Sequence, residues 1–91
     1  MDQGVLAAIR HFPDRRRTIE ELALRSESFR SLCSDLAEAE SALRTWEAAS
    51  SPRQAERCEE YRMLIASLKD ELCATIDAAA GADGATGGRS R

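Results

Sequence analysis

The sequence predicts an all-α fold, a helical hairpin of two long antiparallel helices preceded by a short N-terminal helix. Between Thr18 and Ala80 the chain has no glycine and one proline, Pro52, and it is rich in the strong helix formers Ala, Leu, Glu and Arg. Apolar residues recur there at gaps of three and four, the spacing of one helix face, and no run alternates as a strand would. We therefore expect helices and no β-sheet.

The chain of 91 residues is long enough for one small domain. Its composition changes twice along its length. We expect residues 1–13 to form an N-terminal arm or short helix, 14–80 the helical hairpin domain, and 81–91 a flexible glycine-rich tail.

Two short helices are expected before the hairpin. Apolar residues recur at helical spacing over 5–12, and Pro13 ends this helix because the residue before a proline is disfavoured in the helical region. Asp14 is placed to cap a second helix over 15–25. The apolar pattern then shifts in phase across four polar residues, which favours a break or kink near Ser26 over a helix that runs straight through.

Two apolar stripes predict the long helices. The first occupies the a and d positions of a heptad repeat: Phe29, Leu32, Leu36, Ala39, Leu43 and Trp46. Ser51 followed by Pro52 is typical of a helix start, with serine as N-cap and proline at the first helical position. The second stripe repeats the spacing at Cys58, Tyr61, Ile65, Leu68, Leu72, Thr75 and Ala79. Leu64 and Ile76 widen it to one side, and Gly81 is a candidate C-cap.

These stripes are wider than one antiparallel helix contact can bury. Full burial of a large apolar side chain contributes about 2 kcal/mol, so a second contact face is expected. The sequence predicts a homo-oligomer, most simply a dimer of hairpins with a four-helix bundle core, and leaves another helical protein as a further partner. The expected interface residues are Phe29, Leu32, Leu36, Leu43, Trp46, Tyr61, Leu64, Ile65, Leu68, Leu72 and Ile76.

No motif in the sequence indicates catalysis, a metal site or a cofactor. The single histidine, His11, has no cysteine or second histidine at ligand spacing, so we expect it to be solvated or at a helix interface. Cys33, Cys58 and Cys73 match no zinc or redox motif, which indicates small apolar residues in or beside a helix interface and leaves a regulatory thiol as the alternative. The leading interpretation is a non-enzymatic protein–protein interaction or adaptor module that self-associates through its helical stripes.

The charge pattern leaves one alternative function. A net charge of −3 argues against a nucleic-acid binder, because that affinity depends on clustered Lys and Arg. Arg15, Arg16 and Arg17 nevertheless form a dense basic cluster. A weak nucleic-acid or phosphate-binding module, with these three arginines contacting the anion, is the alternative.

We expect a cytoplasmic protein without a membrane-spanning helix. No stretch of the sequence approaches the roughly 18 uncharged apolar residues of such a helix. The N-terminus carries Asp2 where a secretory signal carries Lys or Arg, and its apolar run is too short for a signal core.

The order of these features resembles the YdcH-like family of small bacterial proteins. Five features carry the resemblance: an early helix with Arg16, Ile19 and Leu22, a polar break before Phe29 and Leu32, a helix with Leu36 and Leu43, a short loop, and the closing stretch 61–72 with Leu68-Lys69-Asp70-Glu71-Leu72. Family members carry more lysine in the last helix and a His- or Asp-bearing turn where this chain has residues 37–41. The resemblance implies an oligomeric helical hairpin and no known activity or site residue.

Overall fold

The computed structural model describes residues 2–89, with the side chains described as far as residue 81. Its elements are α1 (Gln3–His11), the 3₁₀ helix η1 (Pro13–Arg15), α2 (Arg16–Arg25), α3 (Glu27–Glu47) and α4 (Gln54–Arg89). Every regular element of the described residues is helical, so the predicted all-α class is confirmed.

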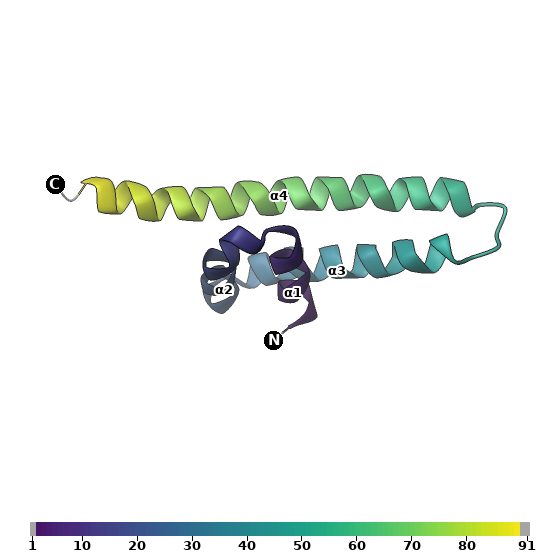
Figure 1. Ribbon diagram of the computed structural model, residues 1–91, viewed down its shortest axis with the longest axis horizontal. Coiled ribbons are helices and arrows are strands. Elements are labelled where there is room, and N and C mark those ends of the chain that lie inside the picture. The colour runs from purple at the N-terminus through teal and green to yellow at the C-terminus, as the bar shows by residue number, and fades with distance from the viewer. Residues whose placement is uncertain (1, 90–91) are drawn as a thin grey trace.

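The two longest helices, α3 and α4, lie side by side and run in opposite directions (Figure 1). Residues 48–53 connect them, and we call this end of the α3–α4 pair the tip. The other end, where α3 begins and where α1 and α2 pack, is called the base. The molecule measures 61 × 23 × 21 Å, and its long axis follows α4. All four α-helices contribute to the base, whereas only α3 and α4 reach the tip.

The short first helix is present, as the apolar spacing predicts. Asp2 caps it, because its Oδ2 accepts hydrogen bonds from the backbone N–H groups of Gly4 at 3.0 Å and Val5 at 3.2 Å. The helix ends before Phe12, whose φ of −131° lies outside the helical region, as the following Pro13 requires.

The start of the second helix differs from the prediction. Asp14 does not cap it, because Pro13–Arg15 first form a 3₁₀ turn that contains Asp14. The N-cap position of α2 is Arg15, and no side chain caps the helix there.

The predicted break near Ser26 is confirmed. Ser26 is extended, with φ −129° and ψ 110°, and it separates α2 from α3. Its Oγ accepts a hydrogen bond from the backbone N–H of Phe29 at 3.1 Å, so the serine caps α3.

Both predicted ends of the last helix are wrong. The helix starts at Gln54, because Pro52 and Arg53 form a turn in which Ser51 accepts hydrogen bonds from the backbone of Arg53 and Gln54. It also continues through Gly81 to Arg89. No glycine in residues 2–89 has the positive φ that a C-cap glycine adopts. Residues 90–91 of the expected tail lie outside the described part of the chain.

The core lies at the base and draws on all four α-helices. Val5, Ala7 and Ala8 of α1 join the same buried cluster as the hairpin residues, so α1 contributes to the core. The largest fully buried side chains are Phe29, Ile19, Leu36, Leu72, Ile76 and Cys33.

Candidate interaction surface

Backbone contact holds α1 against one side of α3. A Cβ atom on Gly4 would lie 2.7 Å from the carbonyl carbon of Cys33 and 2.7 Å from the backbone nitrogen of Ser34. Real side chains do not tolerate such distances, so only glycine permits this approach. Ala7 and Ala8, one helical turn further on, are completely buried. The sequence prediction did not include this contact, although small residues spaced three and four apart in 4–8 are its signal.

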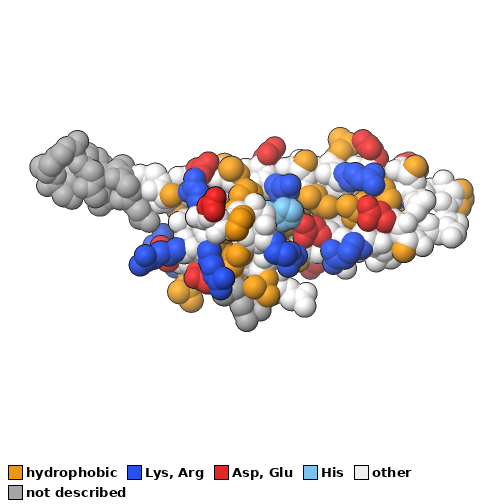
Figure 2. Space-filling model, viewed as in Figure 1, with side chains coloured by type: hydrophobic (Ala, Val, Ile, Leu, Met, Phe, Trp, Pro, Cys, Tyr) orange, Lys and Arg blue, Asp and Glu red, His pale blue; other side chains and the backbone are white. Residues whose placement is uncertain are grey.

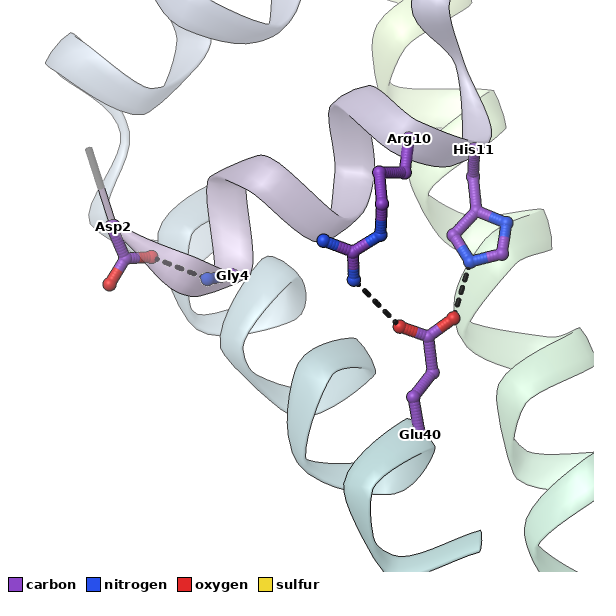
Figure 3. Close-up of polar contacts among 5 residues, drawn as sticks. All are labelled: Asp2, Gly4, Arg10, His11 and Glu40. Carbon is purple, nitrogen blue, oxygen red and sulfur yellow. Dashed lines mark hydrogen bonds and ion pairs between the residues drawn. The ribbon is translucent and has the colours of Figure 1, made fainter. Parts of the chain in front are cut away.

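At the other end of α1, Arg10 and His11 contact Glu40 on the same side of α3 (Figure 3). His11 Nε2 lies 2.5 Å from Glu40 Oε2, and Arg10 Nη2 lies 3.6 Å from Glu40 Oε1. The Glu40 side chain is only 16% exposed, and its Oε1 accepts no hydrogen bond within the described residues. His11 is thus at a helix interface, one of its two expected places, but its carboxylate partner was missed.

This side of the molecule mixes charges of both signs. Figure 2 shows Lys and Arg side chains interspersed with Asp and Glu, and the histidine lies among them. Nearer the tip, Arg62 of α4 lies 3.4 Å from Glu47 of α3. The acidic side chains of α3 on this side therefore have cationic neighbours.

The opposite side of the α3–α4 pair carries an open apolar groove of about 360 Å³. An α-helix turns through about 100° per residue, which places Asp35 and Ala39 on the face of α3 turned away from Cys33 and Glu40. We call this feature the α3–α4 groove. It is lined by Asp35, Glu38, Ala39, Ala42, Tyr61, Leu64 and Leu68.

The floor of the groove is buried and its α4 wall is exposed. Ala39 and Leu68 are almost completely buried, Tyr61 is half-buried, and Leu64 remains 45% exposed. Trp46 lies one helical turn beyond Ala42 on α3, so it extends the α3 wall of the groove toward the tip.

Acidic side chains flank the groove. Asp35 and Glu38 of α3 are exposed, and neither forms an ion pair within the described residues. On α4, Glu60 and Glu71 lie four residues before and seven residues after Leu64, so they share its face. Arg57 is the cation at the tip end; its guanidinium lies 2.8 Å from Glu60 and 6.0 Å from the centre of the Trp46 ring.

The eleven expected interface residues fall into two groups that differ in burial. Five are buried within the single chain: Phe29, Leu36, Leu68, Leu72 and Ile76. Six are partly or largely exposed: Leu32, Leu43, Trp46, Tyr61, Leu64 and Ile65. Leu43, Trp46 and Tyr61 of the second group lie toward the tip, whereas Leu64 lines the groove with Asp35 and Ala39.

Each arginine of the basic cluster has an acidic neighbour. Arg15 Nη2 lies 2.6 Å from Oδ1 of Asp77, which joins η1 to α4. On α2, Arg16 pairs with Glu20 at 3.1 Å and Arg17 with Glu21 at 3.8 Å. These pairs lower the local positive charge, so the geometry does not favour anion binding at this cluster.

The cysteines differ in their surroundings. Cys33 is buried beneath α1, and burial, with a smaller contribution from the charge of Asp2, raises its thiol pKa to about 11. Cys58 is also buried. Cys73 is exposed, and chiefly the negative charge of Asp77 raises its thiol pKa.

Two further features are absent from the described part of the chain. No three His, Cys, Asp or Glu side chains within it are grouped so that they could hold a metal ion. No helix within it combines the length and the apolar character needed to cross a bilayer.

Comparison of the chain with protein-family models, with curated proteins and with solved structures gives no match. The resemblance to the YdcH-like family therefore stays a prediction from the residues.

Proposed function

We propose that this protein is a non-enzymatic protein–protein interaction module whose binding surface is the α3–α4 groove. One observation carries the proposal: the chain covers one side of its α3–α4 pair with α1 and α2 but leaves an apolar groove on the other side. Leu64, the largest aliphatic side chain of that groove to remain exposed, is 45% accessible. An apolar patch flanked by polar residues is typical of an interaction site.

Self-association through the helical stripes remains part of the proposal, but fewer exposed residues support it than the sequence suggests. Leu64 and Ile76 widen the second stripe, and both suggested a second chain. Ile76 is 1% exposed at the base, where α2 contacts α4, so this chain already covers it. Leu64 alone of this pair is left for a partner, which can be a second copy or another protein.

The first experiment measures solution mass by light scattering over a hundredfold concentration range with the thiols reduced. Three proteins are compared: the unaltered chain, Leu64→Glu, and Met63→Glu as the matched control. Met63 neighbours Leu64, is 63% exposed and lies outside the groove. Both variants replace an exposed apolar side chain of α4 with a negative charge, but only Leu64→Glu places that charge in the groove.

Loss of association in Leu64→Glu, but not in Met63→Glu, supports self-association through the groove. If the unaltered chain is monomeric throughout, both variants are used as baits beside it. A partner that the unaltered chain and Met63→Glu retain, and Leu64→Glu loses, supports the proposal. Identical behaviour of the two variants in both assays contradicts it.

A further inference from the structure

The charge and shape of the α3–α4 groove indicate what kind of partner binds there. Resting on the function proposed above, we propose that the α3–α4 groove binds a basic amphipathic α-helix of a partner protein. The apolar face of that helix packs between Ala42 and Leu64, and its Lys or Arg side chains face the acidic residues on both edges. Packing an amphipathic helix into an apolar groove is a recurring mode of recognition.

Unpaired negative charge lies on the groove side of α3. On the side where α1 packs, Glu40 faces His11 and Arg10, and Glu47 faces Arg62. On the groove side, Asp35 and Glu38 have no such partner within the described residues. Exposed, unpaired carboxylates beside an apolar surface raise the rate and specificity of association with a positively charged partner.

The shape of the groove suits a single helix. Tyr61, Leu64 and Leu68 are spaced three and four residues apart along α4, and Ala39 and Ala42 face them from α3. At about 1.5 Å per residue this wall is roughly 10 Å long, which two to three turns of a helix cover. The small alanines on one wall allow close approach, and the large residues on the other supply apolar contact area.

Charge distinguishes a foreign helix from a second copy. A second chain would present the same carboxylates, Asp35 and Glu38, to those of the first. Like charges brought together across an interface oppose association. A helix with cations on both sides of its apolar stripe avoids this repulsion.

The test is a titration of the full chain with synthetic helical peptides of about 14 residues, followed by calorimetry and by the fluorescence of Trp46, the single tryptophan. The first peptide has Leu on one face and Lys on both flanks. The second has Glu in place of each Lys. The third is a scrambled Leu/Lys peptide of the same composition, which retains the charge but has no apolar face.

Two charge-neutralised variants accompany the titration. Asp35→Asn plus Glu38→Gln removes two charges from the groove, and Glu59→Gln plus Asp70→Asn removes two from the outer face of α4. We expect the Leu/Lys peptide alone to bind the unaltered chain. We expect the groove variant to weaken that binding at least tenfold and the outer-face variant to change it less than twofold. Binding should also weaken as salt is raised.

Three outcomes would overturn the inference, and they differ in what they imply for the proposed function. Equal binding of the Leu/Lys and Leu/Glu peptides, abolished by Leu64→Glu, means that the groove binds helices without regard to charge. Binding of no peptide by a chain whose dimer Leu64→Glu dissociates means that a second copy occupies the groove. In both cases the proposed function stands. No peptide binding, together with no difference between Leu64→Glu and Met63→Glu in mass or partner capture, overturns the inference and the function.

Discussion

The base and the tip of the α3–α4 pair share one pattern of apolar stripes, but the stripes are fully buried only at the base. At the base, Phe29, Leu36 and Leu72 are at most 1% exposed, because α1 and α2 add a further layer. Toward the tip, Trp46 and Tyr61 occupy equivalent stripe positions and stay half-buried. Two helices that touch along one line cannot cover a stripe wider than that line.

Folding stability and partner binding therefore depend on different parts of the molecule. The core residues of the base are at most 8% exposed and have little side-chain area left to offer. Leu24 of α2 lies outside that core and is 85% exposed. The tip and the groove keep apolar area in contact with water, which supplies the driving force for association. Substitutions at the base should therefore affect folding, and those at the groove should affect binding.

The largest effect is expected from Leu72→Ala, which leaves a cavity in the base. Leu72 is completely buried, and truncation of such a leucine costs about 2–5 kcal/mol of unfolding free energy. Urea denaturation followed by circular dichroism measures the loss. A cost below about 1 kcal/mol would mean that the base is not a packed core and that the distinction from the tip fails.

Gly4→Ala tests whether α1 completes the base. The added methyl meets the backbone of Cys33 and Ser34 at 2.7 Å, and helix backbone cannot yield as a flexible side chain does. Overpacking of this kind costs about 1–3 kcal/mol, despite the better helix propensity of alanine. Faster amide hydrogen exchange in α1 and the first half of α3, with unchanged exchange near the tip, is the expected signature. Stabilisation by the substitution would contradict the close approach.

Much of this architecture could be predicted from the sequence, because it depends on local patterns. The three-and-four spacing gives α3 and α4 their inward faces, and the phase shift near Ser26 marks a break that the serine then caps. The helix ends at Asp14, Pro52 and Gly81 were predicted wrongly. A capping residue marks a possible helix end, but the turn next to it determines the residue at which the helix starts or stops.

What the sequence could not reveal depends on contacts between distant segments. Gly4 fits against Cys33 only because α1 crosses α3 at that point, and the pairing of His11 with Glu40 joins residues 29 positions apart. The two residues that widen the second stripe, Leu64 and Ile76, look alike in sequence. Their different exposure follows from the place where α2 contacts α4, which no local pattern encodes.

Glu40→Ala is expected to lower the unfolding free energy by about 1–2 kcal/mol, less than Leu72→Ala or Gly4→Ala. Glu40 accepts from His11 across the α1–α3 contact and is mostly buried, and hydrogen bonds to charged groups contribute somewhat more than neutral ones. Glu38→Ala is the matched control, because Glu38 lies two residues away on an exposed part of α3 without an ion pair in the described residues. Equal stabilities of the two variants would show that the cluster does not help to hold α1 at the base.

The base should also weaken in alkali through Cys33. Its thiol pKa is raised from 9.0 to about 11 in the folded chain, so the folded state keeps a proton that the unfolded state releases. The contribution to stability is complete below about pH 9 and is lost as the pH rises toward about 11. Between about pH 8 and pH 10.5, the unaltered chain should lose on the order of 1 kcal/mol more than Cys33→Ala does. Equal losses would place this thiol in contact with water.

The smallest effect is expected from Leu64→Ala, the same chemical change as Leu72→Ala placed in the groove. Because Leu64 is 45% exposed, its truncation removes little buried area and should shift the unfolding free energy by no more than about 0.5 kcal/mol, provided that the chain is monomeric in the assay. The measurement uses the same urea curves at two protein concentrations. A loss that approaches that of Leu72→Ala and grows with concentration would show that a second copy already buries the side chain. The groove would then be closed in solution, and base and tip would differ only in which chain completes the core.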